Sequence, residues 1–169
     1  MNVGQIMTKD VRCCLPWDNL AEAANSIWEV DCGVLPVVDE EGKLQGILTD
    51  RDLAIAVGTR SRKAADILVK EVMIRDVKTC GPETDLEGVM RVMRRAKVRR
   101  VPVVDDDGKV VGIITLNDLV MAATPKRGPV DYDEVIETLK VVSAPWRHNV
   151  PGVIDAAAVH LPSIPVAVA

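Results

Sequence analysis

The sequence has 169 residues, 48 % of them apolar, and its 21 basic and 25 acidic side chains give a formal net charge of −4. That length suits one compact domain or two small ones with an apolar core. The mild acidity disfavours binding to nucleic acid, which usually requires a basic domain. The core should be aliphatic and rich in β-branched residues, because the chain has no phenylalanine and one tyrosine.

We expect a cytoplasmic protein that does not cross a membrane. The sequence has no apolar run of about 18 residues, and its first residues lack the basic and apolar regions of a signal peptide. Its four cysteines form no C-x-x-C pair, and both histidines lie near the carboxyl end, so a metal site has no support. The cysteines should be reduced, buried thiols.

An internal repeat with a constant offset of 66 residues organises the chain. Residues 3–57 align without a gap on residues 69–123, and 19 of the 55 paired positions are identical. The densest block pairs residues 36–39 (PVVD) with residues 102–105 (PVVD). Two copies indicate a pseudo-twofold pair of motifs and not a longer solenoid.

The first repeat predicts the element order β-α-β-β-α. Asp18 is expected to be the N-cap of its first helix, and Gly42 supplies the turn residue of its hairpin. Pro36 lies inside a strand, which implies an edge position or an unpaired amide position there. The expected elements are a strand over residues 11–14, a helix over about 19–30, strands 34–38 and 44–48 around a turn at 40–43, and a helix from 50 to about 57.

The second repeat predicts the same order, and further elements follow it. Thr84 and Glu87 have the spacing of a capping box. The expected elements are a strand over residues 77–80, a helix over about 85–96, strands 101–104 and 110–114 around a turn at 106–109, a helix from 116 to about 123, a short helix over 64–72 between the repeats, and an amphipathic helix over 131–142.

The fold class is therefore mixed α/β (α+β): two tandem β-α-β-β-α motifs packed as a pseudo-twofold pair, with a carboxy-terminal helix and tail. Residues 143–169 contain four prolines and no clear period, so we interpret them as an arm or a disordered tail. The predicted boundaries are a first motif at 1–60, a linker at 61–68, a second motif at 69–124, and the helix with its tail at 125–169.

The two motifs resemble the CBS-domain family over about residues 3–123. The resemblance rests on residues 35–39 (LPVVD) followed by 46–52 (GILTDRD), and on 101–105 (VPVVD) followed by 112–118 (GIITLND). It implies that the motifs pack through their sheets into one module of the Bateman type, whose cleft binds adenosine-containing ligands. It also implies a change of conformation or assembly on binding, and dimerisation into a flat disc of four motifs.

The resemblance further implies a polar role for a threonine and an aspartate in each motif. Thr49 and Asp52 would serve the first site, and Thr115 and Asp118 the second, with the hydroxyl on phosphate and the carboxylate on ribose. Physical chemistry agrees, because a helix N-terminus attracts phosphate and a carboxylate accepts two hydrogen bonds from a diol. The alternative is a capping box that needs no ligand.

Basic residues distinguish the two repeats. Residues 91–100 carry six positive charges, whereas the equivalent residues 25–34 carry none. We expect Arg99, Arg100 and Arg51 to hold phosphates, with Asn117 in the place of Arg51 in the second motif. The other arginines of this stretch, Arg91, Arg94 and Arg95, should form a solvated helix face or pair with an acidic second subunit.

Apolar candidates complete the expected site. Pro36 and Pro102 would flank a flat ring, and Val11 and Val77 would contact adenine, although purely structural roles explain all four equally well. Gly46 and Gly112 would let a ligand approach the backbone. Trp28, which replaces Arg94 in the first repeat, is expected either at an interface or in the core.

The leading hypothesis is a non-catalytic regulatory sensor. Its ligand would be AMP, ADP or ATP, with NAD or S-adenosylmethionine behind them, and it would act as a homodimer on an unidentified regulated protein. The alternative is a dimerisation module that binds no nucleotide. An enzyme is disfavoured, because neither histidine lies in the repeats and residues 124–169 are too few for a catalytic domain.

Overall fold

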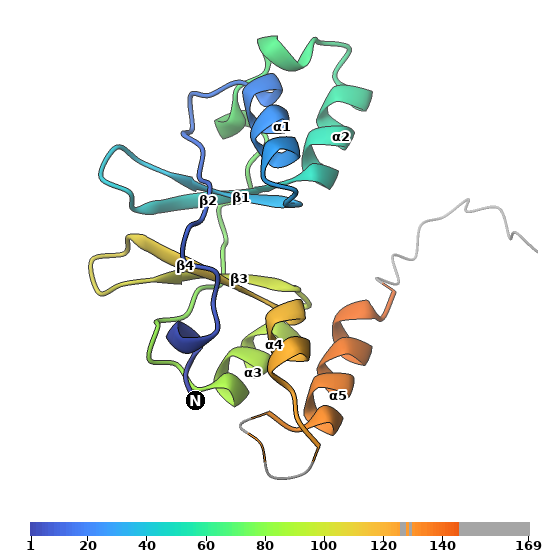
Figure 1. Ribbon diagram of the computed structural model, residues 1–169. Helices are drawn as coiled ribbons and strands as arrows, with labels where there is room; N and C mark the ends of the chain where they lie inside the picture. The colour runs from blue at the N-terminus through green and yellow to red at the C-terminus, as the bar shows by residue number, and fades with distance from the viewer. Residues whose placement is uncertain (126–127, 129, 146–169) are drawn as a thin grey trace, which may run out of the picture.

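The computed structural model describes residues 1–125, 128 and 130–145. In both halves of the molecule a β-hairpin carries helices on its outer side, and the two hairpins face each other at the centre (Figure 1). In chain order the elements are the 3₁₀ turn η1 (Val3–Gln5), α1 (Leu20–Glu29), β1 (Val34–Val38), β2 (Leu44–Thr49), α2 (Asp50–Thr59), the 3₁₀ turns η2 (Ala64–Asp66) and η3 (Val69–Glu71), α3 (Leu86–Ala96), β3 (Arg100–Val104), β4 (Val110–Thr115), α4 (Leu116–Ala122) and α5 (Tyr132–Ser143).

The two hairpins confirm the predicted pairs of strands. β1 pairs with β2 in an antiparallel register that sets Val34 opposite Thr49, and β3 pairs with β4 so that Arg100 lies opposite Thr115. Each turn contains a glycine in the left-handed region, Gly42 with φ +83° in one hairpin and its counterpart in the other. A side chain there would be strained, which explains why both copies carry glycine.

The strands predicted over residues 11–14 and 77–80 are wrong. Each segment makes one parallel bridge, in which Cys14 N–H donates to the carbonyl of Pro36 and Val38 N–H donates to the carbonyl of Cys14. The next bond of a parallel ladder would run from the amide of residue 36 to the carbonyl of Arg12. Proline has no amide hydrogen, so the ladder ends there, and Pro102 ends the equivalent ladder in the second repeat.

The predicted helix caps are each one residue too early. Asn19, not Asp18, accepts the amides of Ala21 and Glu22 at the start of α1. Likewise Asp85, not Thr84, accepts the amide of Gly88 at the start of α3. The helix predicted over residues 64–72 is also wrong, because this stretch forms the separate 3₁₀ turns η2 and η3 with extended backbone at Ile67 between them.

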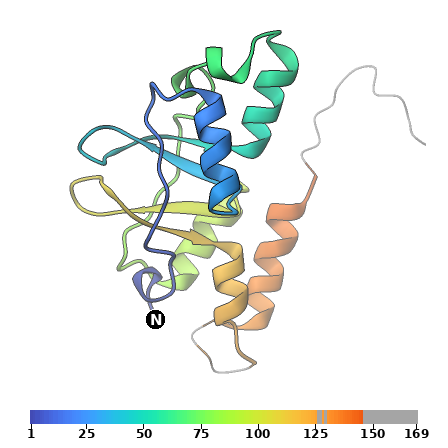
Figure 2. The same ribbon diagram turned by 45° about the horizontal axis from the view of Figure 1, so that its top comes forward.

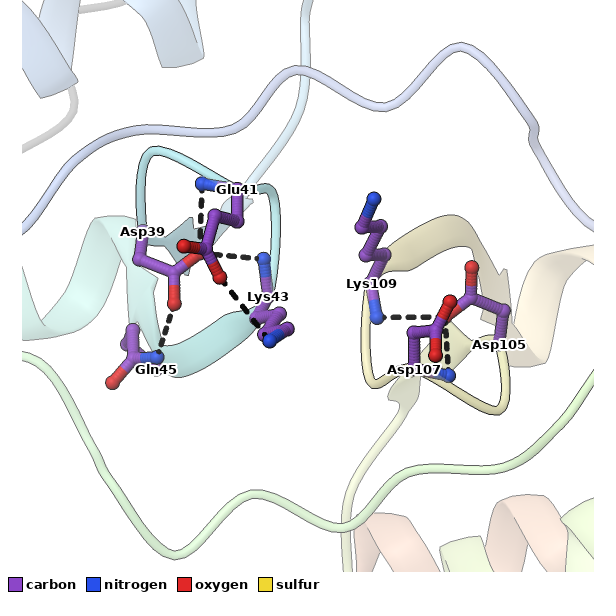
Figure 3. Close-up of polar contacts among 7 residues, drawn as sticks. All are labelled: Asp39, Glu41, Lys43, Gln45, Asp105, Asp107 and Lys109. Atoms are coloured by element: carbon purple, nitrogen blue, oxygen red, sulfur yellow. Dashed lines mark hydrogen bonds and ion pairs between the residues drawn. The ribbon is translucent and has the colours of Figure 1, made fainter.

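The hairpin turns hold the halves together by backbone pairing. Leu44 N–H donates to the carbonyl of Gly108 over 3.0 Å, and Val110 N–H donates to the carbonyl of Gly42 over 3.1 Å. Figure 3 shows the two turns facing each other, each organised by one aspartate. In the first turn Asp39 Oδ1 accepts the amides of residues 41 and 43, and the second turn repeats this arrangement around Asp105.

The opening segment of each repeat packs on the other repeat. Val3 is fully buried in the core of the second repeat, and its amide donates to the carbonyl of Thr84. In the same way Val69 is fully buried in the core of the first repeat, and its amide donates to the carbonyl of Asp18. Figures 1 and 2 show the amino terminus beside the second half of the molecule, from which the chain runs across to α1.

This exchange explains the glycine in β2 and its counterpart in β4. A Cβ at Gly46 would lie 2.9 Å from the carbonyl oxygen of Ile74, and one at Gly112 would lie 3.0 Å from that of Thr8. The prediction that these glycines let a ligand approach is therefore replaced by a different finding. The chain that approaches them is the opening segment of the other repeat.

The predicted carboxy-terminal helix is confirmed as α5, which packs on α3 and α4. Its buried residues Val135, Thr138 and Val142 lie on one face, whereas the apolar residues Ile136 and Leu139 of the same predicted helix are exposed. Residues 146–169, which make up most of the predicted tail, lie outside the described residues. In the part of the chain that the structure describes, no helix has the length and apolar character that crossing a bilayer requires.

Candidate functional site

Two clefts between the repeats correspond to each other under the 66-residue offset. Cleft A has a volume of about 740 Å³ and cleft B one of about 320 Å³. Cleft A is lined by Val34, Ile47, Thr49, Asp50, Arg51, Ile74, Asp76, Val77, Lys78, Ala96, Lys97, Val98, Arg99, Arg100 and Val142. Cleft B is lined by Thr8, Asp10, Val11, Arg12, Val30, Asp31, Cys32, Gly33, Val34, Arg100, Ile113 and Thr115.

Each cleft combines parts of both repeats. Cleft A takes residues 34, 47 and 49–51 from the first repeat, and most of its remaining lining comes from residues 74–78 and 96–100 of the second. Cleft B takes Thr115 from the second repeat and residues 8–12 and 30–34 from the first. The exchange of opening segments described above brings these parts together, so neither repeat forms a cleft by itself.

The clefts differ in charge. Five basic and two acidic residues line cleft A, whereas two of each kind line cleft B. The basic residues of cleft A surround Thr49, which is the N-cap of α2. A helix N-terminus adds partial positive charge, so cleft A is suited to an anionic group such as phosphate. The basic residues are Arg51, Lys78, Lys97, Arg99 and Arg100.

The structure brings the three predicted phosphate ligands into one cleft. Arg51, Arg99 and Arg100 all line cleft A, although the first belongs to α2 and the others come just before β3 or at its start. Gly33 makes room for Arg100, because a Cβ at residue 33 would lie 3.1 Å from Arg100 Nη2. Lys78, which the sequence reasoning missed, lies in the same cleft and pairs with Asp76 over 2.6 Å.

The predicted threonine–aspartate pairs form capping boxes. Thr49 Oγ1 donates to Asp52 Oδ2 over 2.6 Å, and Asp52 N–H donates back to Thr49 Oγ1 over 3.2 Å. Thr115 and Asp118 repeat this arrangement with distances of 2.8 and 3.2 Å. The hydroxyl hydrogen of each threonine is therefore directed at a carboxylate. The Oδ1 atom of Asp52 accepts no hydrogen bond from the described residues, but neither Asp52 nor Asp118 is among the residues that line clefts A and B.

Other predicted residues are distributed between the clefts and the hairpins. Val77 lines cleft A and Val11 lines cleft B, and their contact with adenine stays a prediction. Pro36 and Pro102 are buried within their hairpins and do not line either cleft. Asn117 lines a neighbouring hollow of about 380 Å³ together with Arg99, Arg100 and Thr115.

The arginines of α3 are not a uniform solvated face. Arg91 is exposed and pairs with Glu87, and Arg95 is exposed. Arg94, however, is half-buried, and its Nη1 donates to Thr138 Oγ1 of α5 over 2.8 Å. The prediction of a solvated face is therefore wrong for Arg94, because the packing of α5 covers it.

Trp28 is 85 % exposed, which removes the core alternative for this side chain. It lies on α1, and Ile55 of α2 is also exposed, at 55 %. On the second repeat α5 packs over the corresponding helices α3 and α4. Large exposed apolar side chains are typical of interaction surfaces, so the α1–α2 face is a candidate interface.

All four cysteines are free thiols, and two of them are buried. Burial raises the pKa of Cys14 from 9.0 to about 12, with nearby Asp18 adding to the shift. Burial also raises the pKa of Cys80 to about 11. Both thiols stay protonated at neutral pH, so they pack as small apolar groups and are poor nucleophiles.

The clefts and the repeat belong to a known class of module. The family model for the CBS domain matches residues 3–58 and 69–124. The chain belongs to the CBS-domain family, and it contains a pair of these domains. The CBS domain-containing protein YhcV of Bacillus subtilis is 35 % identical over 120 residues, which make up 71 % of this chain and 84 % of that protein.

A match to an enzyme is confined to part of that enzyme. The inosine-5'-monophosphate dehydrogenase of Methanocaldococcus jannaschii is 36 % identical over 130 residues, which are 73 % of this chain. The chain spans 25 % of the length of that enzyme. It also spans 61 % of an uncharacterised Methanopyrus kandleri protein, to which it is 29 % identical.

Solved structures of similar CBS pairs contain adenosine derivatives. The CBS domain pair of protein MJ0100, in complex with 5'-methylthioadenosine and S-adenosyl-L-methionine, matches with a TM-score of 0.65 and 32 % identity, covering 72 % of this chain and 94 % of that one. CBSX2 in complex with AMP matches with a TM-score of 0.64 and 30 % identity over 72 % of this chain and 94 % of that one.

Proposed function

We propose that this protein is a non-catalytic regulatory sensor that binds an adenine nucleotide in cleft A. The observation that carries the proposal is the concentration of five basic side chains around Thr49 at the start of α2. This charge favours AMP, ADP or ATP over uncharged adenosine, and it disfavours the cationic sulfonium of S-adenosylmethionine. NAD, with its two phosphates, ranks behind the adenine mononucleotides.

Each part of cleft A has a role in this proposal. The phosphates bind Arg51, Arg99 and Arg100 at the amino end of α2, and the base packs on Val77. The proposed acceptor of the ribose hydroxyls is Asp52, which is bonded to the cleft residue Thr49 but is not itself among the residues that line cleft A. Thr49 contributes indirectly, because its hydroxyl holds the carboxylate of Asp52 in place. Cleft B is smaller and carries balanced charge, so it is the secondary site.

The regulatory part of the proposal follows from the position of cleft A between the two repeats. A ligand that contacts residues of both repeats stabilises one relative arrangement of the halves, and it can shift an equilibrium only through that difference in affinity. We propose a cytoplasmic homodimer whose assembly or conformation responds to the nucleotide, and which acts on a protein partner.

A specific observation supports a second candidate, a dimerisation module that binds no nucleotide. Thr49 and Asp52 bond to each other at their own helix end, so they need no ligand to be satisfied. The exposed Trp28 would supply the interface. Under this alternative the basic residues of cleft A would serve solubility or pair with an acidic partner.

Thermal melting with a panel of ligands separates the two candidates. Nucleotide-free protein is heated alone and with AMP, ADP, ATP, NAD, S-adenosylmethionine and GTP. A ligand at a hundredfold excess over its Kd stabilises the folded state by about 2.7 kcal/mol. For a domain of this size, that free energy raises the Tm by roughly 5–10 °C. A shift specific to adenine nucleotides supports the sensor, and no shift with any ligand supports the dimerisation module.

A further inference from the structure

The carboxy-terminal helix α5 reaches cleft A, although it lies beyond the second segment that matches the CBS domain. Val142, in its last turn, is one of the residues that line the cleft. The next residue, Ser143, accepts a hydrogen bond from Arg99 Nη2 over 3.2 Å. One of the proposed phosphate-binding residues is therefore also bonded to α5.

A second arginine fixes α5 in this position. Arg94 Nη1 donates to Thr138 Oγ1 over 2.8 Å, and Thr138 is fully buried, with its own hydroxyl donating to the carbonyl of Glu134. In the first repeat the positions of Arg94 and Arg99 are occupied by Trp28 and Gly33, neither of which carries a guanidinium. The chain therefore has anchors for α5 beside cleft A and lacks them beside cleft B.

We infer that α5 is a functional part of the nucleotide site, in which Ser143 positions Arg99 for the phosphates; this inference rests on the proposed function. A guanidinium has five N–H donors, so Arg99 can bond to Ser143 and to a phosphate at the same time. An arginine that is held in place loses less side-chain entropy when it binds a ligand. Docking of α5 and binding of phosphate therefore favour each other, and this coupling is reciprocal.

Calorimetric titration of three variants with ATP and with adenosine tests the inference. Ser143→Ala removes the acceptor for Arg99, and Thr138→Val removes the acceptor for Arg94 without changing the cleft. Glu137→Ala, on the exposed face of the same helix, is the matched control. The first two variants should weaken ATP binding by about threefold to tenfold, as the loss of a hydrogen bond predicts, and leave adenosine binding unchanged. The control should bind both ligands like the wild type.

Amide hydrogen exchange of α5 with and without ATP provides a second readout. The inference predicts slower exchange in residues 138–144 when ATP is bound to the wild-type protein. If the wild type binds ATP, but Ser143→Ala and Thr138→Val bind it equally well and exchange in α5 does not change, α5 only covers the core and the inference is overturned. If the wild type binds neither ligand, the proposed function fails together with it.

Discussion

The hydroxyl of Thr49 donates a hydrogen bond to Asp52 Oδ2 over 2.6 Å, and the amide of Asp52 donates back to Thr49 Oγ1. This reciprocal pair caps α2 and fixes the carboxylate of Asp52 against Thr49, which lines cleft A. The capping role and a binding role of the motif are therefore compatible. Asp52 Oδ2 serves the helix, and Oδ1 accepts no hydrogen bond from the described residues.

Substitution of the two aspartates separates these roles. Asp52→Ala and Asp118→Ala should each lower the free energy of unfolding by about 1 kcal/mol, because each removes half of a capping box. Only Asp52→Ala should also reduce the rise in Tm that ATP produces. Asp118 is bonded to Thr115, which lines cleft B and not cleft A. Urea unfolding and thermal melts measure both effects. Full retention of the ATP response in Asp52→Ala would count against the assignment of Asp52 to the ribose.

The approach of Ile74 to β2 predicts an intolerance of side chains at residue 46. Gly46→Ala should lower the free energy of unfolding by about 1–3 kcal/mol, because its Cβ would lie 2.9 Å from a backbone oxygen that is itself in a bridge. Gly58→Ala is the control, since a Cβ at this position of α2 meets no atom within 4 Å. That control should be neutral or stabilising by up to about 1 kcal/mol. Equal urea midpoints for the two variants would refute the exchanged packing.

The exposure of Trp28 predicts a role in self-association. Light scattering of the wild type at micromolar concentration should give twice the chain mass of 18.3 kDa. Trp28→Ser should shift the equilibrium toward the monomer, because it removes a large apolar contact area. Ile136→Gln, which changes an exposed residue of α5, should leave the mass unchanged. If light scattering gives the mass of a single chain for the wild type at micromolar concentration, the dimer is removed from the proposal.

The raised thiol pKa values predict a loss of stability at alkaline pH. The pKa of Cys14 is about 12 in the folded protein against an ordinary value of 9.0, so folding favours the protonated thiol. The contribution is complete below pH 9, and it is lost as the pH rises from 9 toward 12. The slope for one thiol reaches at most about 1.4 kcal/mol per pH unit. Urea unfolding between pH 8 and 10.5 should show a smaller slope for Cys14→Ala than for the wild type; identical slopes would contradict this account.

Local signals in the sequence were sufficient to predict helices α1 to α5 and both hairpins, but not the two 3₁₀ turns within residues 64–72. The turns at Gly42 and Gly108 and the apolar spacing of α1, α3 and α5 depend on residues close together in the chain. The strands predicted at residues 11–14 and 77–80 failed because their pairing ends at a proline distant in the sequence, which lacks the amide hydrogen that the next bond of the ladder needs. The one-residue errors at Asp18 and Thr84 arose because neighbouring polar residues there can all serve as caps.

The candidate site was predictable only in part, for a reason of symmetry. Val3 and Val69 are equivalent in the repeat, so the sequence does not show whether each packs in its own half or in the other. Arg51, Arg99 and Arg100, which their charge singled out as phosphate ligands, all line cleft A, and their binding of phosphate stays a prediction. Lys78 and Val142 were missed, because only the exchange of segments and the packing of α5 bring them to cleft A.

The central claim is that cleft A binds an adenine nucleotide, and calorimetric titration of nucleotide-free protein with ATP tests it most directly. The account predicts one high-affinity site per chain for the wild type, and about tenfold weaker binding at that site in Arg51→Gln and in Arg100→Gln. Binding at that site should be unchanged in Arg12→Gln, because Arg12 lines the secondary cleft B and not cleft A. Absence of binding heat at several temperatures, or loss of binding in Arg12→Gln with full binding in Arg51→Gln, would contradict it.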